Sequence, residues 1–305
     1  MKPVAAGIPA ALAALTLAPF LARFGWPFEM LGFFRPHYAA LSLAAAVVFL
    51  PFRRFIPAGA AFVLVVVNLA ATMPWERPGH PPPAGAARLR LLLLNVWDRN
   101  DDADAVAALL RSQRPDVVGL TELTPAWARA LAPALGSFRA RAVRPEASPF
   151  GIGLYSRVPL TGARIARFGS RGTPSVVVRL QLGGRTLTLV LIHPPPPYSP
   201  GASARHRSEY RALASMTFAR PVAICGDLNA PPWSWAYDHL ASALDLRDAN
   251  RDRLAGTWPS FLPAFLRIPI DTCLLSDGVT VTRRETGPEV GSDHVPVLLE
   301  LAPAA

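Results

Sequence analysis

Charged side chains are almost absent from the first quarter of this 305-residue chain and common in the rest. Residues 1–75 carry six of them: Lys2, Arg23, Glu29, Arg35, Arg53 and Arg54. A segment with so few charges cannot supply a water-soluble surface of its own. We therefore expect two different parts, an apolar N-terminal region and a polar domain that begins at Arg88.

Three apolar stretches fill the N-terminal region, at Pro3 to Ala22, Tyr38 to Phe52 and Phe55 to Met73. A helix that crosses the hydrocarbon core of a bilayer needs about 20 apolar residues, so the first and third are long enough and the second is short. Residues 1–75 are interpreted as a membrane anchor, with three transmembrane helices as the favoured arrangement. A cleaved signal peptide is the alternative, but no clear small-residue cleavage site supports it.

Basic residues in short loops favour the cytoplasmic side of a membrane. In a three-span arrangement Lys2 and the Arg53-Arg54 pair share one side, which predicts a cytoplasmic N-terminus and an outward-facing polar domain. Residues 76–87 are rich in Pro and Gly and predict a linker. Residues 88–305 then form the polar domain.

Charge and cysteine content narrow the function only a little. The formal net charge is +10, which favours anionic partners but does not choose between nucleic acid, phospholipid and small phosphates. The two cysteines, Cys225 and Cys273, lie in apolar runs without CxxC spacing, so we interpret them as buried thiols rather than as a disulfide.

Strand and helix patterns alternate from Arg88 onward. Strands are predicted at 89–96, 116–121, 151–156, 175–182, 185–192, 222–225, 270–276 and 295–301, and helices at 103–110, 125–135 and 205–217. Gly183-Gly184 predicts a two-residue hairpin turn between two of the strands. This mixture of βα units and hairpins predicts an α/β layered fold with mixed sheets.

Polar side chains follow the ends of five predicted strands, where α/β folds build their sites. They are Asn95, Glu122, His193, Asp227 with Asn229, and Asp293 with His294, while Asp271 lies inside a sixth strand. Each alone has a structural explanation, such as a turn, a helix cap or a solvated loop. Together at one sheet edge, however, such groups would repel or desolvate one another unless a ligand uses them.

A divalent cation is the ligand that these residue types suit best. Mg²⁺ is held by oxygen atoms and needs only one or two protein carboxylates when a substrate phosphate completes its coordination. Asn95, Glu122 and Asp293 offer such oxygens. His193 and His294 are suited to contact phosphoryl oxygens and the charge that develops on them during reaction.

The order of motifs resembles the endonuclease/exonuclease/phosphatase superfamily, in particular its membrane-anchored bacterial branch. The motifs are LNVW, PDVVGLTEL, GIGLYSR, LVLIHP, CGDLNAPPWS, PIDTCLLS and GSDHVPV, and they span residues 89–301. The resemblance implies a four-layer α-β-β-α sandwich of two mixed sheets and hydrolysis of a phosphodiester or phosphomonoester bond by water, with Mg²⁺ or Mn²⁺. It also implies a multi-pass protein of the bacterial inner membrane.

The resemblance implies a role for each polar residue at the strand ends. Glu122 would be the principal metal ligand, with Asn95 and Asp293 close to the ion. Asp227 would orient or deprotonate the attacking water, and Asn229 would hold Asp227 or the phosphate.

The histidines complete this implied set. His193 and His294 would contact the scissile phosphate, and Asp271 would fix the tautomer of His294. One departure concerns the substrate, because Trp97 stands where abasic-site nucleases of the superfamily have an aspartate. This disfavours abasic-site repair and leaves nucleic acid, phospholipid and small phosphoesters open. The alternative function is a binding module that keeps the fold without the reaction.

Overall fold

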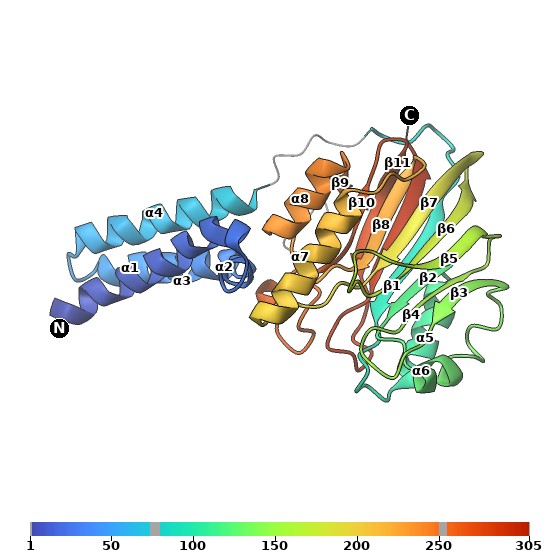
Figure 1. Cartoon of the computed structure of the whole chain (residues 1–305). Helices are drawn as coiled ribbons and strands as arrows, with labels where there is room; N and C mark the ends of the chain where they lie inside the picture. Colours follow the sequence, from blue (N-terminus) through green and yellow to red (C-terminus); the bar gives the residue numbers. More distant parts are fainter. Residues whose placement is uncertain (1, 74–79, 250–254, 305) are drawn as a thin grey trace.

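The structure is a computed structural model that describes residues 2–73, 80–249 and 255–304. An N-terminal bundle of helices lies beside a larger domain built of two sheets and further helices (Figure 1). In the bundle, α1 (Lys2–Leu17) continues into the 3-10 helix η1 (Ala18–Phe24), and the short α2 (Phe28–Gly32) follows. The bundle then continues with α3 (Arg35–Phe49) and α4 (Phe55–Thr72).

The bundle is apolar on the outside. Its buried faces carry small residues such as Ala39 and Ala61, together with one polar contact in which the Asn68 amide donates to Thr16 Oγ1 at 2.8 Å. Large apolar side chains on the same helices are exposed, among them Leu43, Val47, Phe62 and Val66. Small residues and polar contacts inside with apolar groups outside are typical of helices packed within lipid.

Two of the three predicted apolar spans have the length and hydropathy of a membrane-crossing helix. These segments are Gly7–Phe24 and Phe55–Thr72. The middle stretch forms α3, whose 15 residues fall short of the usual span. The structure therefore provides two candidate spanning helices.

Sheet A has six strands in the order β11-β12-β1-β2-β4-β3. Their bounds are Val279–Thr286, Val297–Pro303, Leu89–Asn95, Val117–Thr121, Ile152–Ser156 and Ala140–Arg144. β1 and β2 run parallel, and the other neighbours are antiparallel. The sheet is therefore mixed.

Sheet B repeats this plan in the order β5-β6-β7-β8-β10-β9. Its strands span Thr161–Arg167, Pro174–Leu182, Arg185–Ile192, Val222–Asp227, Asp271–Leu275 and Arg247–Asp248. Only β7 and β8 are parallel among these pairs. The β6–β7 hairpin turns at Gly183 and Gly184, both with positive φ, as predicted.

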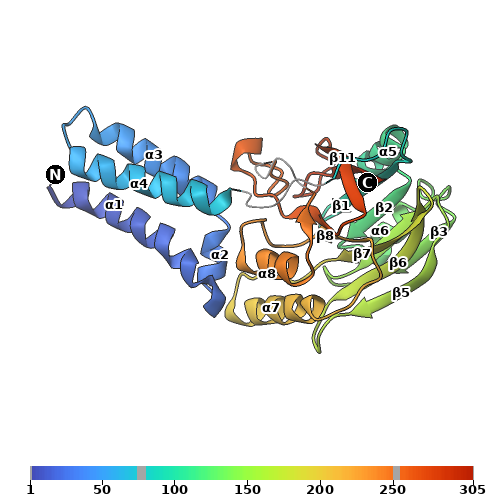
Figure 2. The ribbon, with the colours of Figure 1, turned by 90° about the horizontal axis from the view of Figure 1, so that it is seen from above.

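The two sheets pack face to face with helices outside (Figure 2). Apolar residues from both sheets, such as Leu93, Leu189 and Leu299, form the central core. Helices α5 (Ala103–Gln113) and α6 (Pro125–Ala130) cover sheet A, and α7 (Pro200–Ala214) and α8 (Trp235–Ala243) cover sheet B. This confirms the four-layer α-β-β-α sandwich of two mixed sheets.

The two cysteines form a disulfide bond, so the interpretation as buried thiols is wrong. Antiparallel pairing of β8 with β10 sets Cys225 directly opposite Cys273, with their Cα atoms 4.0 Å apart. The two residues are 48 positions apart in the chain. Their register depends on strand pairing, which spacing in the sequence does not reveal.

The bundle is docked on the domain at residues 22–37. Arg207 of α7 donates to the carbonyl oxygens of Ala22 and Arg23 and to Glu29, and its guanidinium lies 3.9 Å from the Trp235 ring centroid. The Trp233 indole donates to Gly32 O at 3.0 Å. Of the predicted linker, residues 76–79 lie outside the described residues, and residues 80–87 form neither helix nor strand.

Candidate active site

The strand directions bring the predicted polar residues to one edge of the sandwich. The parallel pairs β1–β2 and β7–β8 end at this edge, and the antiparallel β10 and β12 begin there. Contacts connect all eight predicted residues, which are Asn95, Glu122, His193, Asp227, Asn229, Asp271, Asp293 and His294. They come from both sheets, so the site spans the sandwich.

Asn95 joins the acids of the two sheets. Its Nδ2 donates to Glu122 Oε1 at 2.9 Å and to Asp227 Oδ2 at 3.0 Å. Its Oδ1 accepts from the Trp97 N–H at 2.9 Å. The nitrogen therefore faces the carboxylates, and Asn95 could offer its oxygen to an ion only after its amide turned over.

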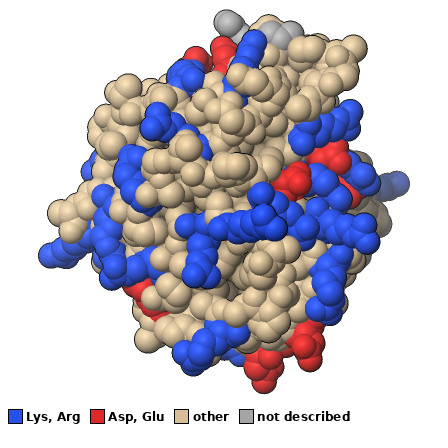
Figure 3. Space-filling view, turned by 90° about the vertical axis from the view of Figure 1, so that its right-hand side faces the viewer, with Lys and Arg blue, Asp and Glu red and all other residues tan. Residues whose placement is uncertain are grey.

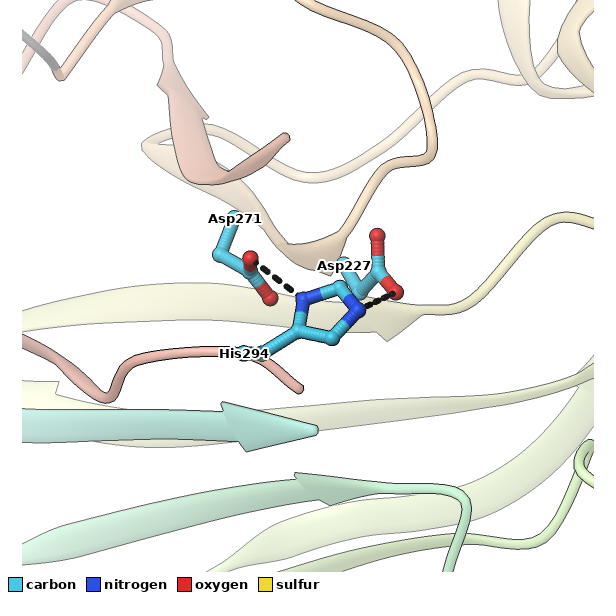
Figure 4. Close-up of side chains that lie close together, drawn as sticks. All are labelled: Asp227, Asp271 and His294. Atoms are coloured by element: carbon cyan, nitrogen blue, oxygen red, sulfur yellow. Dashed lines mark hydrogen bonds and ion pairs between the residues drawn. The ribbon is translucent and has the colours of Figure 1, made fainter. Parts of the chain in front are cut away.

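His294 lies between two carboxyl groups (Figure 4). Its Nδ1 is 2.8 Å from Asp271 Oδ2, and its Nε2 is 3.7 Å from Asp227 Oδ2. Burial disfavours the charged imidazolium, but Asp271 and Asp227 outweigh burial and raise the pKa of His294 to about 10. The ring is therefore a buried cation at neutral pH.

His193 contacts the same carboxylate from the other side. Its Nδ1 lies 3.4 Å from Asp227 Oδ2 and its Nε2 lies 3.8 Å from Glu122 Oε1. Burial opposes its protonation, yet the adjacent carboxylate of Asp227 raises the pKa of His193. Burial alone would also raise the pKa of Asp227, but the two histidines lower it to about 2. Asp227 is consequently an ionised, hydrogen-bonded acceptor.

Asn229 orients Asp227 through its backbone. Its N–H donates to Asp227 Oδ1 at 2.9 Å, and its side-chain Nδ2 donates to Pro194 O at 3.0 Å. Asn229 has a left-handed φ of 46°, a conformation that asparagine tolerates better than most residues. This tight turn holds the Asp227 carboxyl toward the pocket.

Asp293 has one carboxylate oxygen without a hydrogen bond. Its Oδ2 accepts from Trp258 Nε1 at 3.1 Å, whereas its Oδ1 is buried, makes no hydrogen bond and lies 3.9 Å from His294 Nε2. Glu122 and Asp227 line the same pocket. A buried carboxylate oxygen without a partner is costly unless a cation or proton meets it. The donor set therefore fits a hard divalent cation.

Among the described residues, the acidic and histidine side chains whose ligand atoms lie close enough together to hold an ion are Asp227, Asp271 and His294. Here, however, His294 Nδ1 is already hydrogen-bonded to Asp271. This trio is better described as a hydrogen-bonded relay that fixes the ring of His294.

Several supporting residues were not predicted from the sequence. Thr257 Oγ1 accepts from the Asp271 N–H, and Ser292 Oγ donates to Asn95 O at 2.6 Å. Behind His193, Thr173 Oγ1 donates to the His193 carbonyl oxygen and hydrogen-bonds to the buried Glu209. Small hydroxyl residues at loop positions carry no distinctive pattern, so only the fold reveals these roles.

The site opens into a pocket of about 470 Å³. Its polar lining residues include Glu122, His193, Asp227, Asn229, Asp293 and His294. Apolar residues line much of the rest, including Phe150, Trp258 and Ile268 of the domain. Three further lining residues, Met30, Phe33 and Phe34, come from the N-terminal bundle.

Comparison with known proteins agrees with this geometry. The sequence pattern of the Endonuclease/Exonuclease/phosphatase family matches residues 92–294. This range contains all eight site residues and ends on His294. The chain belongs to this family. No curated protein sequence matches it.

Solved structures of the endonuclease/exonuclease/phosphatase fold resemble the chain at low identity. Humanized D. rerio TDP2 is 19% identical, with a TM-score of 0.59, over 70% of this chain and 98% of that one. The human Nocturnin catalytic domain with bound sulfate is 18% identical, with a TM-score of 0.57, over 74% and 96%. An endonuclease/exonuclease/phosphatase from Beutenbergia cavernae is 18% identical, with a TM-score of 0.56, over 72% of each chain. These likenesses show a common fold.

Proposed function

We propose that the protein is a membrane-anchored phosphoesterase that uses Mg²⁺ or Mn²⁺ to hydrolyse a phosphodiester or phosphomonoester bond by attack of water. One observation carries the proposal: carboxylates from both sheets and two imidazoles meet in a single pocket, where one buried Asp293 oxygen makes no hydrogen bond. Membership of the family supports phosphoester hydrolysis, and the exposed apolar bundle supports the membrane anchor.

The acidic side chains divide the work of binding and activation. Glu122 and Asp293 would hold the ion, with Asn95 joining them once its amide turns. When bound, the ion would polarise the phosphoryl group and offset its charge. Asp227 would accept a hydrogen bond from the attacking water and orient it, since a pKa of about 2 makes it a weak base.

The two histidines would bind the phosphoryl oxygens. His294, held as a cation by Asp271, would donate from Nε2 and stabilise the negative charge of the transition state. His193 would contact the phosphate from the opposite side of Asp227. The backbone turn at Asn229 keeps the Asp227 carboxylate fixed throughout.

The test is hydrolysis of bis(p-nitrophenyl) phosphate by the full-length protein in maltoside micelles. We expect activity with Mg²⁺ or Mn²⁺ and none with EDTA. Glu122→Ala, Asp227→Ala and His294→Ala should each lower kcat/KM by about 100-fold or more, the usual loss when a group that stabilises the transition state is removed. Asp101→Ala, which removes an exposed acid near the pocket, is the matched control and should keep the wild-type rate.

A binding module that has lost the reaction is the competing function. It requires that metal-loaded protein be inactive towards a broad panel of phosphoesters while still folded. Full activity in all three site variants would instead overturn the residue assignment and leave the family membership untouched.

We further propose that the catalytic domain faces outward from a bacterial inner membrane. The disulfide between Cys225 and Cys273 supports this side, since disulfides persist in oxidising compartments. The Arg53-Arg54 turn, at the end of the bundle away from the domain, supports an inward position for that end.

Single cysteines test this orientation in intact cells with a membrane-impermeant maleimide. Arg164→Cys, on the exposed strand β5, should react without permeabilisation. Arg54→Cys should react only after permeabilisation. The opposite pattern would place the domain in the cytoplasm.

A further inference from the structure

The N-terminal bundle contributes a wall of the active-site pocket. Met30 lies in α2, and Phe33 and Phe34 follow this helix directly; all three line the same pocket as the acidic residues. Phe33 is buried and packs against Ile268 and Ile270, and Ile270 immediately precedes Asp271. The apolar wall is therefore continuous with the chemical site.

The wall is fixed in place by contacts at both of its ends. At the start, Arg207 pairs with Glu29 and binds the Ala22 and Arg23 carbonyl oxygens. At the other end, His37 Nε2 lies 2.9 Å from Leu266 O, while Gly32 O accepts from Trp233. The pocket is consequently complete only when residues 22–37 are docked.

The same wall joins the pocket to the membrane-facing part of the molecule. Residues 28–34 connect η1 to α3, so they lie between helices whose outer faces are apolar. His37 contacts the loop that contains Leu266. Two aromatic side chains of this loop are largely exposed to solvent, Phe261 at 76% and Phe265 at 81%. Exposed aromatic rings beside a membrane bundle suit the boundary between lipid and water.

The charge of the pocket does not suit a long polyanion. Among its described lining residues, Arg99 is the one basic side chain apart from the histidines. A nucleic acid gains most of its affinity from a row of cations along its backbone. A substrate with one phosphoryl group and an apolar chain would instead suit a pocket lined both by the polar site residues and by Met30, Phe33 and Phe34.

We propose that the substrate is a phosphoester bearing an apolar chain, taken from the bilayer, and that Met30, Phe33 and Phe34 determine this specificity. The proposal rests on the phosphoesterase function above. The phosphoryl group would lie at the acidic wall, and the first part of the chain against the α2 wall. The remainder of the chain would stay in the lipid.

The experiment measures kcat/KM for p-nitrophenyl alkyl phosphates with alkyl groups from methyl to decyl. Full-length protein in maltoside micelles is used, and the leaving group is the same throughout the series. We expect kcat/KM to rise with chain length by up to about fourfold for each methylene that the wall buries, equivalent to ~0.8 kcal/mol. The ratio of decyl to methyl ester is the readout.

A double variant separates the wall from simple enrichment of long esters in micelles. Met30→Ser with Phe34→Ser should lower the decyl-to-methyl ratio by at least tenfold, because micelle partitioning is unchanged and the apolar wall is lost. Ile56→Ser, at an 88% exposed bundle position at the start of α4, is the control and should keep the ratio. An equal ratio in the double variant and the wild type would overturn the proposal.

The outcomes also distinguish this proposal from the function beneath it. Hydrolysis of the methyl ester with no rise in kcat/KM along the series would refute the proposed apolar-chain substrate and leave the phosphoesterase function standing. If neither these diesters nor the monoester p-nitrophenyl phosphate is hydrolysed with metal present, the phosphoesterase function itself is refuted.

Vesicles containing phosphatidylglycerol or a polyprenyl phosphate then tell a glycerolipid source from an isoprenoid one. Faster cleavage of an oligonucleotide than of either lipid would overturn the proposal.

Discussion

At the scale of single residues, the site depends on backbone conformations that most side chains avoid. Glu122 and Asn229 have left-handed φ angles of 56° and 46°. Such residues cost of order 1–3 kcal/mol and persist only where surrounding structure enforces them. At Glu122 the Leu123 N–H is held by the Gly151 carbonyl oxygen at 3.0 Å, and the carboxylate is thereby turned toward Asn95.

Gly226 is the residue whose substitution should be most damaging outside the reacting groups. Its φ is +136°, and an added Cβ would lie 2.1 Å from the Ile192 carbonyl oxygen. Gly226→Ala should therefore destabilise the domain by about 3 kcal/mol or more, since both strain and a backbone clash oppose it.

The matched control for this substitution is Gly184→Ala. Gly184 also has a positive φ, of +80°, but nothing lies within 4 Å of its added Cβ. That substitution should cost only about 1–2 kcal/mol from the left-handed backbone. Thermal unfolding followed by near-UV circular dichroism measures both, and equal shifts in Tm would contradict the clash.

At the scale of elements, the sequence predicted the central strands and missed the peripheral ones. β1, β2, β7 and β8 are buried apolar runs, so their pattern is visible. β3 and β5 form sheet edges with mostly exposed or half-buried residues, so neither strand has a buried apolar run that would reveal it in the sequence. Helix α8 was not predicted; the face that it packs on sheet B consists of Ala236, Tyr237, Leu240 and Ala241.

The polar part of the site was also predictable, because it depends on the same buried strands that the sequence reveals. Polar residues at the ends of buried strands stand out in the sequence, so all eight candidates came together in space. The apolar wall was not predicted, because Phe33 meets Ile268 only after the bundle docks. Contacts between residues more than 200 positions apart leave no local pattern.

Helix α7 carries two buried titratable groups with opposite effects on stability. Burial lowers the pKa of His206 to about 4 and raises the pKa of Glu209 to about 7. Between pH 6.5 and 4 the unfolded His206 binds a proton that the folded one does not, so acidification removes stability. Between pH 4.5 and 7 the folded Glu209 keeps a proton that the unfolded one loses, so stability falls as pH rises.

His206→Gln should therefore flatten the acid side of the stability profile. The wild type should lose up to about 3 kcal/mol through this group between pH 6.5 and 4, and the variant should not. Glu209→Gln should act on the other side of the profile. The wild type should lose stability through this group as the pH rises above 4.5, and the variant should not. Tm measured across pH 4 to 8 tests both, and profiles parallel to the wild type in both variants would contradict these shifts.

At the scale of the whole molecule, charge and apolar surface occupy opposite ends. Figure 3 views the end remote from the bundle and shows basic side chains spread across it. β3 and β5, which lie at this end, carry Arg141, Arg144, Arg164 and Arg167. Salt screens exposed charges beyond roughly 8 Å under physiological conditions. Arginines at the end remote from the bundle are therefore not expected to hold the pocket against an anionic membrane surface. Under the proposed membrane anchor, the docked bundle would orient the pocket instead.

Arg207 should be the residue that holds this docking. Arg207→Ala leaves the buried Glu29 without its cation, a loss that costs about 3–5 kcal/mol for buried pairs. We expect faster tryptic cleavage after the exposed Arg23, detected as a defined N-terminal fragment by mass spectrometry. Arg111→Ala, at an exposed position of α5, is the control, and an unchanged cleavage rate in Arg207→Ala would contradict the role of this contact.

The α2 wall also decides how the rate of such an enzyme would depend on concentration. If the bundle anchors the protein in a membrane as proposed, the pocket that it completes would meet its substrate within the plane of the bilayer, not in the surrounding water. The relevant quantity is then the mole fraction of substrate among the lipids. Adding inert lipid at a constant total amount of substrate would slow the reaction, even though every molecule of substrate is still present in the tube.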